Sequence, residues 1–156
     1  MPSFKGQYEH SIDEKGRVAF PAKLRKILSP HAQERFTIVR GQTEECLYLY
    51  PENEWEIVEE KLSRINSFSK NGRLAKRYFL RFAEDVALDK QHRIAIPTDH
   101  LTYSGVDSKV VFIGMGEYIE IWSPEKLLEA DENMSPEAIE DIFEQVLGNN
   151  NQETGA

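Results

Sequence analysis

A ten-residue pattern occurs twice in this chain, and it restricts the folds that the chain can adopt. Residues 12–21 read Ile-Asp-Glu-Lys-Gly-Arg-Val-Ala-Phe-Pro, and residues 88–97 read Leu-Asp-Lys-Gln-His-Arg-Ile-Ala-Ile-Pro, at an offset of 76. Asp, Arg, Ala and Pro stand at the same places in both copies. The segments that follow each copy also correspond in order and in apolar character. A repeat of this length marks equivalent structural units, so the chain is predicted to contain two similar halves.

Each half is predicted to consist mainly of short strands. Segments 8–12 and 17–20 flank a tight turn, which is typical of a β-hairpin. In that turn Asp13 is expected to accept hydrogen bonds from backbone N–H groups, with Gly16 in the left-handed conformation. The second copy has His92 in place of the glycine, and histidine tolerates positive φ better than most residues.

Strands and helices are also expected outside the repeated motif. Pro21 and Pro97 are predicted to end their strands and to suit the first turn of a short helix, such as 22–28. Further strands are predicted over 36–41, 46–51, 110–114 and 118–124. Helices are predicted over 53–65, 74–82 and 136–147, with Asn71-Gly72 as a helix breaker and 148–156 as a mobile tail.

Charge is unevenly distributed along the chain. The 156 residues carry 27 acidic and 19 basic side chains, a formal net charge of −8, which by itself argues against binding to nucleic acid. However, residues 1–27 have a net charge of +3 and residues 61–93 have +6, whereas 28–60 have −6 and 94–156 have −11. The two basic segments contain the two repeated motifs, so they can form a local basic surface that the total conceals.

Composition limits the cellular setting. Cys46 is the single cysteine, which excludes an intrachain disulfide and a multi-cysteine zinc site and fits a reducing cytosol. The sequence contains no apolar run of the roughly 18 residues that a membrane span needs, and its first residues do not resemble a signal peptide. We therefore expect a cytoplasmic protein without a membrane partner.

The repeated motif resembles the MraZ family of bacterial transcriptional regulators, which are built from two SpoVT-AbrB-type units. Two Asp-x-x-x-Arg motifs, each followed by an apolar residue and proline, carry the resemblance, together with Glu54-Trp55 and Ala83-Glu84. The resemblance implies a mainly β fold with flanking helices (α+β), a duplicated swapped-hairpin barrel in one chain. It also implies a first unit over 4–52, connecting helices over 53–82, a second unit over 83–128, and a C-terminal helix and tail over 129–156.

The candidate binding residues lie at the two turns. The residues expected to contact DNA are Lys5, Lys15, Arg17, Lys90 and Arg93; those expected to shape the turns and hairpins are Asp13, Gly16, Pro21, Asp89 and Pro97. Arginine can contact a guanine edge in bidentate fashion. The alternative is that each aspartate and arginine only pair to lock the turn. The second copy is expected to suit DNA less well, because it has Gln91-His92 and lacks an arginine after Pro97.

Other functions are weighed against DNA binding. The basic residues of 61–93 can contact either DNA or the acidic segments of neighbouring subunits. No histidine spacing predicts a catalytic triad or a zinc site, and no glycine-rich phosphate loop occurs, so an enzyme is not expected. An antitoxin-like interaction protein is the other alternative, but such relatives carry one hairpin unit and a long disordered tail, whereas here most of the chain is folded repeat.

The resemblance implies a specific role in the cell. It implies a nucleoid-associated repressor of its own cell-division and cell-wall gene cluster, acting as a ring of identical subunits on short repeated promoter sites. Double-stranded DNA and further copies of the chain are the implied partners. No cofactor, metal or small-molecule substrate is expected.

Overall fold

The computed structural model describes residues 3–148, which fall into two units. One unit ends at Pro124 and the other begins at Glu125. Within the described residues, the first unit contains the strands and the second consists of helices. The tail predicted over 148–156 lies outside the described residues, apart from Gly148.

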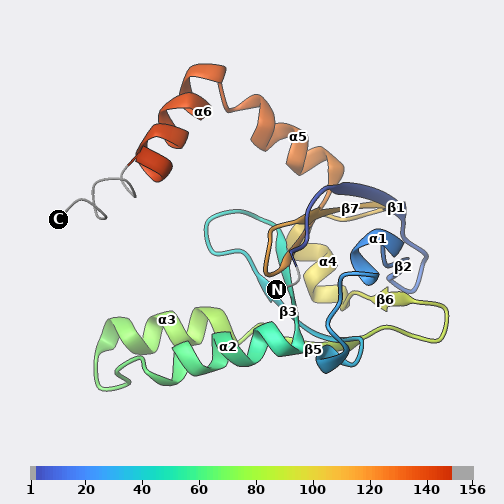
Figure 1. Ribbon diagram of the computed structural model, residues 1–156, viewed down its shortest axis with the longest axis horizontal. Helices are drawn as coiled ribbons and strands as arrows, with labels where there is room; N and C mark the ends of the chain where they lie inside the picture. The colour runs from blue at the N-terminus through green and yellow to red at the C-terminus, as the bar shows by residue number, and fades with distance from the viewer. Residues whose placement is uncertain (1–2, 149–156) are drawn as a thin grey trace. The chain divides into compact units, whose positions relative to one another are not determined.

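Eight antiparallel strands form two sheets in the first unit (Figure 1). The strands are β1 (Gln7–Ser11), β2 (Arg17–Ala19), β3 (Arg35–Arg40), β4 (Leu47–Pro51), β5 (Glu84–Ala87), β6 (Arg93–Ala95), β7 (Lys109–Gly114) and β8 (Ile119–Trp122). Six of them form one sheet in the order β1-β7-β8-β4-β3-β5, and β2 pairs with β6 in a separate two-stranded ribbon. The mainly β class predicted from the sequence is confirmed, but these strands form an open sheet and a ribbon, with no closed barrel among residues 3–148.

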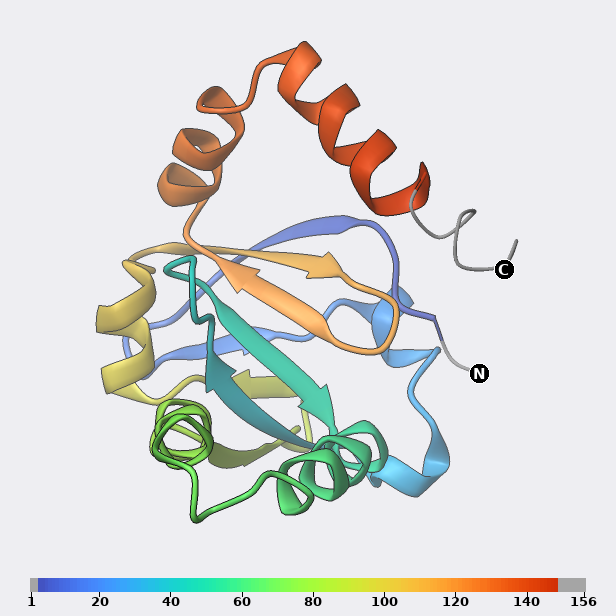
Figure 2. The ribbon, with the colours of Figure 1, turned by 90° about the vertical axis from the view of Figure 1, so that its left-hand side faces the viewer.

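The strand order reflects the internal repeat. Strands β1, β3 and β4 of the first half correspond to β5, β7 and β8 of the second half. Equivalent strands therefore occupy equivalent places when the sheet order is read from its two ends. At its centre β4 pairs with β8, with Tyr48 opposite Glu120, and strands far apart in sequence therefore lie side by side (Figure 2). In the ribbon, Val18 pairs with Ile94, its equivalent at the offset of 76. An approximate two-fold axis thus relates the two halves.

The sequence predicts that segments 8–12 and 17–20 pair with each other as a hairpin, and this pairing is wrong. Strands β1 and β2 share only one isolated bridge, between Ile12 and Val18. Beyond that bridge β1 pairs with β7, and β2 pairs with β6, both from the other half. The second half behaves in the same way, because β5 pairs with β3. Each half alone would leave the apolar faces of these strands uncovered, and exchange of the strands covers them in one shared core.

One hydrophobic core lies between the six-stranded sheet and the ribbon. Alternate residues of each strand point into this core, and in β3 and β8 the residues between them are buried as well, on the other face of the sheet. Both halves contribute fully buried side chains to this core, including Phe36, Ile38, Leu47 and Leu49 from the first and Val110, Phe112, Ile119 and Ile121 from the second. Val18 and Ile94 cover the core from the ribbon side.

Short helices follow the strands. Pro21 precedes α1 (Ala22–Arg25) and Pro97 precedes α4 (Thr98–Ser104), as the sequence predicts, although α1 ends before Leu28. A 3-10 turn, η1 (Pro30–Ala32), leads into β3. Helix α2 (Glu52–Ser63) agrees with the predicted helix to within two residues at each end.

Helix α3 (Lys70–Leu80) begins four residues before the predicted start at residue 74. The Ser69 hydroxyl accepts a hydrogen bond from the Gly72 N–H at 3.1 Å and caps the first turn. A side chain at Gly72 would collide with the carbonyl of Asn66. The glycine is therefore accommodated inside the helix because of a close backbone approach, and the prediction of a breaker at Asn71-Gly72 is wrong.

The second unit contains α5 (Pro124–Glu132), which was not predicted, and α6 (Pro136–Phe143). Ser135 caps α6 by accepting a hydrogen bond from the Ala138 N–H at 3.1 Å. A wider π-type turn, η2 (Glu144–Gly148), continues it, so the helical stretch covers the predicted range of 136–147.

Candidate nucleic-acid interface

The turn between β1 and β2 is fixed by a single carboxylate. Asp13 Oδ1 accepts hydrogen bonds from the backbone N–H groups of Lys15 at 2.9 Å and Arg17 at 2.8 Å. Asp13 Oδ2 accepts a third bond from Arg17 Nε at 2.7 Å. The backbone closes the same turn, with Gly16 N–H donating to the Asp13 carbonyl at 3.0 Å. The turn predicted from the sequence is therefore confirmed, and the expected aspartate–arginine pair is formed.

The turn between β5 and β6 repeats this arrangement despite its different sequence. Asp89 Oδ1 accepts from the N–H groups of Gln91 and Arg93, each at 2.9 Å, and Asp89 Oδ2 accepts from Arg93 Nε at 2.9 Å. His92 occupies the place of Gly16 with φ of 59°, against 78° for the glycine. The Gln91-His92 replacement therefore changes the side chains at this turn and preserves its backbone geometry.

Hydrogen bonding by the arginines lowers the pKa of both aspartates. The backbone N–H of Arg17 is the main cause for Asp13, and that of Arg93 is the main cause for Asp89. A carboxylate that accepts several N–H groups is favoured in its charged form. Both turns therefore depend on ionised aspartates.

Acid is expected to loosen both turns. Because folding lowers these pKa values below the ordinary 3.8, the aspartates stabilise the fold above that value, and this stabilisation is lost as the pH falls through the folded-state pKa. We therefore expect the native chain to have a higher free energy of unfolding than the double variant Asp13→Asn/Asp89→Asn at pH 6, and this gap to narrow at pH 4 and pH 2.5. Urea unfolding at the three pH values measures it. A gap of constant size across this range would contradict the assignment.

Each turn is bonded to the opposite half of the chain. The carbonyl of Gly16 accepts a hydrogen bond from Ile96 N–H at 2.8 Å, and the carbonyl of His92 accepts one from Phe20 N–H at 2.9 Å. Both turn residues have positive φ, which aims their carbonyls at the neighbouring strand end. The two turns and the ribbon are consequently held as one rigid element.

The outer face of the ribbon carries two arginines and two alanines. Val18 and Ile94 point into the core, so their neighbours face outward, with Arg17 opposite Ala95 and Ala19 opposite Arg93. The arginine side chains are 35% and 30% exposed. Each uses Nε for its aspartate, and within residues 3–148 the terminal Nη atoms have no hydrogen-bond partner. The ribbon thus presents two oriented guanidinium groups beside small side chains.

The remaining predicted residues are placed differently. Lys15 and Lys90 are exposed in their respective turns, and the second turn borders a shallow hollow of about 300 Å³. Lys5 lies beyond the opposite end of β1, where its backbone approaches Gly114. The five residues of β1 separate it from the turn by about 16 Å, so the structure does not bring Lys5 to the ribbon.

The outward alanines were not among the residues predicted to form the site. Ala19 and Ala95 occupy the same place in both copies of the repeat, and both are exposed. An exposed alanine conserved between two copies is a signal that the surface must stay flat there. Larger side chains at these places would stand between the two guanidinium groups and any approaching ligand.

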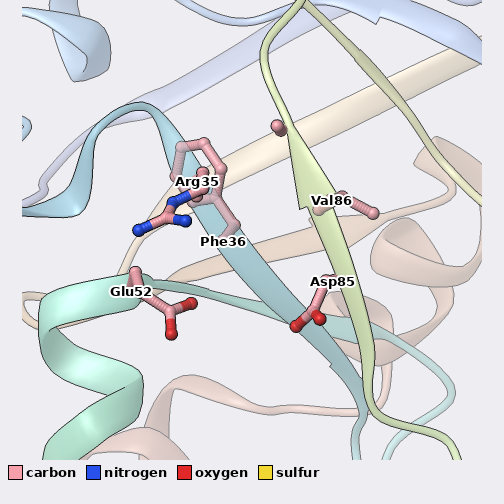
Figure 3. Close-up of a pocket in the computed structure, with 6 residues that line it drawn as sticks. Arg35, Phe36, Glu52, Asp85 and Val86 are labelled. Carbon is pink, nitrogen blue, oxygen red and sulfur yellow. The ribbon is translucent and has the colours of Figure 1, made fainter.

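A separate pocket of about 220 Å³ lies beside β3, β5 and the start of α2 (Figure 3). Arg35, Glu52 and Asp85 face it from these three elements. Burial and then the charge of Asp85 raise the pKa of Glu52, whereas Arg35 lowers it. The pocket thus combines one guanidinium group with two carboxylates.

Comparison with known proteins identifies the family. The sequence model described as "MraZ protein, putative antitoxin-like" matches this chain twice, over residues 3–78 and 79–147. The two matches follow the internal repeat and together span most of the chain. The chain belongs to the MraZ family. Known MraZ proteins resemble it over nearly their full length.

Three of these relatives carry the name Transcriptional regulator MraZ. The protein of Syntrophomonas wolfei is 36% identical over 144 residues, which cover 92% of this chain and 96% of the relative. That of Natranaerobius thermophilus is 37% identical with the same coverage. That of Caldanaerobacter subterraneus is 42% identical over 120 residues, which cover 77% of this chain and 80% of the relative. Among the described residues of this MraZ chain, no helix is long and apolar enough to span a membrane.

Proposed function

We propose that this protein is a transcriptional regulator that binds specific DNA sequences through the β2–β6 ribbon. The observation that carries the proposal is the pair of guanidinium groups on the outer face, each oriented by an aspartate and with its Nη atoms left for a ligand. The major groove of B-DNA admits a two-stranded β-ribbon, and arginine binds the O6 and N7 atoms of guanine in bidentate fashion. The names of its curated relatives support the same function.

The roles of the turn residues follow from their positions. Arg17 and Arg93 contact base edges, because their orientation is fixed by hydrogen bonds on the side away from DNA. Lys15 and Lys90 are exposed in the turns and contact phosphates, which position the ribbon without reading sequence. Lys5 lies outside this surface. The aspartate–arginine pair and DNA contact are therefore compatible roles, because they use different nitrogen atoms of the same side chain.

The proposal includes self-assembly and a genetic target. One ribbon offers few contacts, and the net charge of −8 weakens non-specific attraction to DNA. Several ribbons in a ring-shaped oligomer, bound to short repeated promoter sites, multiply weak contacts into firm binding. We place this assembly in the cytoplasm at the nucleoid, as a repressor of its own cell-division and cell-wall gene cluster.

The substitution Arg17→Ala tests the ribbon. Loss of one bidentate contact costs about 1–3 kcal/mol at each site, so affinity for DNA upstream of its own gene should fall by about fivefold or more, and further when several ribbons bind together. Arg17→Lys should lose sequence preference while keeping most of the salt dependence. Gel-shift titrations at fixed salt, against a scrambled DNA of equal length, measure both effects.

Arg64→Ala is the matched control for this experiment. Arg64 is also an exposed arginine that pairs with an acidic residue four positions away, but it lies at the end of α2. The Arg64→Ala substitution should leave DNA affinity unchanged. If Arg17→Ala lowers only the unfolding midpoint and binds DNA like the native chain, Arg17 serves the turn alone and the proposed contact is wrong.

A further inference from the structure

Helices α2 and α3 form an arm of residues 52–81 with little buried surface. The two helices run side by side (Figure 1). Trp55 of α2 stacks on Phe79 of α3, with ring centroids 5.8 Å apart. Helix α3 has no fully buried residue, and α2 has only Glu54 and Trp55, both near its start. Beyond the start of α2, the side chains of the arm are therefore half-buried or exposed.

The loop at the end of the arm holds an exposed aromatic side chain in a fixed position. Phe68 is 96% exposed. Its backbone N–H donates to Asn66 Oδ1 at 3.0 Å, and its carbonyl accepts from Arg73 Nη1 at 3.1 Å. Lys76 Nζ also donates to Ser67 Oγ at 2.8 Å. A loop fixed by this many side-chain bonds presents Phe68 as a rigid apolar contact.

One face of α3 is basic and surrounds an apolar hollow. Arg73, Lys76, Arg77 and Leu80 are spaced so that they share one face of the helix. Leu80 and Lys76 line a hollow of about 280 Å³ with Leu62, Ser63 and Glu59 of α2, and the Glu59 carboxylate accepts a hydrogen bond from Trp55 Nε1. Residues 66–83 contain five basic side chains and no acidic one.

Helix α6 has the complementary character. Ile139, Ile142, Phe143 and Val146 lie on one face, and each is between 42% and 60% exposed. Residues 136–148 contain four acidic side chains and no basic one. The apolar face of α6 is bordered by acidic residues, and the hollow on the arm is bordered by basic residues. Among the described contacts, neither surface is covered by another element of its own unit.

We propose that α6 of one copy docks into the hollow on the arm of a second copy. Its apolar face covers Leu62, Leu80 and Phe68, and its acidic residues approach the basic face of α3. Because the two surfaces differ, the contact is heterologous and leaves a free arm and a free α6 at the ends of any open assembly. The inference rests on the proposed self-assembly and names the surfaces that produce it.

DNA is a less suitable occupant of the arm. The phosphate backbone of DNA is charged and offers nothing apolar to Leu62, Leu80 or Phe68. An amphipathic acidic helix offers both an apolar face and negative charge. The second copy is therefore the occupant whose charge and apolar character fit the surface.

Two one-sided variants test the contact. Arg77→Glu/Leu80→Glu alters the arm, and Ile142→Asp/Phe143→Asp alters α6. Native mass spectrometry should find assemblies for the native chain and monomers for each variant. A one-to-one mixture of the variants should form a dimer and nothing larger, because it contains one intact arm facing one intact α6. Tyr78→Glu, an exposed position on another face of α3, is the matched control and should assemble like the native chain.

The outcomes separate the two levels of the proposal. Variants that assemble like the native chain overturn this interface and leave self-assembly standing. A native chain that is monomeric overturns both. Monomeric variants whose mixture forms no dimer show that the intact arm of one chain and the intact α6 of another do not bind each other, which also overturns the inference.

Crosslinking keeps the inference testable if a charged variant fails to fold. Leu80→Cys in one chain and Phe143→Cys in another, mixed and treated with a short bismaleimide, should yield a covalent dimer. The native Cys46 is buried and does not compete. Tyr78→Cys in place of Leu80→Cys is the control. If the Leu80→Cys pair yields no more covalent dimer than the Tyr78→Cys pair, the proposed contact is overturned.

Discussion

Replacing Phe20 with alanine is expected to lower the free energy of unfolding by about 3–5 kcal/mol. Phe20 is buried at the end of β2, and its ring lies 5.2 Å from Phe36 of the first half and 6.0 Å from Phe112 of the second. Alanine would leave a cavity under both halves of the sheet at once. Since domains of this size are stabilised by about 5–15 kcal/mol in total, the loss is a large part of the whole.

Urea unfolding at one fixed protein concentration measures this effect, because assembly makes the midpoint depend on concentration. Met115→Ala is the control, since Met115 is a large apolar residue that is 41% exposed, and it should change the free energy by less than about 1 kcal/mol. Equal effects of the two substitutions would mean that Phe20 does not join the halves.

A valine in place of Gly16 is expected to destabilise the fold by about 3 kcal/mol or more. Gly16 has φ of 78°, where a β-branched residue is strongly strained. A Cβ atom there would also lie 2.8 Å from the Ile96 carbonyl oxygen and 3.2 Å from Leu101 Cδ1. The turn would have to move, and its bond from Ile96 N–H to the Gly16 carbonyl would be lost.

The equivalent position in the other turn provides the comparison. His92 already has a side chain at a φ of 59°, so His92→Gly should change the free energy of unfolding by no more than about 1 kcal/mol. Thermal and urea unfolding of both variants measure the contrast. If Gly16→Val unfolds like the native chain, the turn is soft and the view of the ribbon as a rigid element is wrong.

The repeated motif was enough to predict the two halves, both turns and the mainly β class. It could not reveal the strand partners. Alternation of apolar and polar residues shows which face of a strand is buried, but it is the same whether β1 pairs with β2 or with β7. The exchange between halves depends on pairs far apart in sequence, such as Gln7 with Ile113 and Val18 with Ile94, which local patterns do not encode. The start of α3 was also mispredicted. Ser69 caps the helix, and Gly72 lies inside it because its backbone packs closely against Asn66.

For the candidate site, the sequence identified the turn residues but left the role of their charges open. Pairing of Asp13 with Arg17 and contact with DNA looked like competing interpretations. The structure shows that Nε makes the pair while the Nη atoms stay available among the described residues, a distinction that needs atomic geometry. Lys5 was predicted to contact DNA together with the turn residues, but the structure places the whole of β1 between Lys5 and the turn.

Joining two copies in one polypeptide also frees each copy to change independently. In a dimer of identical chains, any substitution appears at both turns, and the paired surface must remain symmetric. Here one turn has Lys15-Gly16 and the other has Gln91-His92 on an otherwise matching backbone. The ribbon therefore has a direction, with unlike side chains at its two ends. If the ribbon binds DNA as proposed, this direction would distinguish one orientation of a DNA site from the other, and copies arranged in the same sense would match sites repeated head to tail rather than inverted ones.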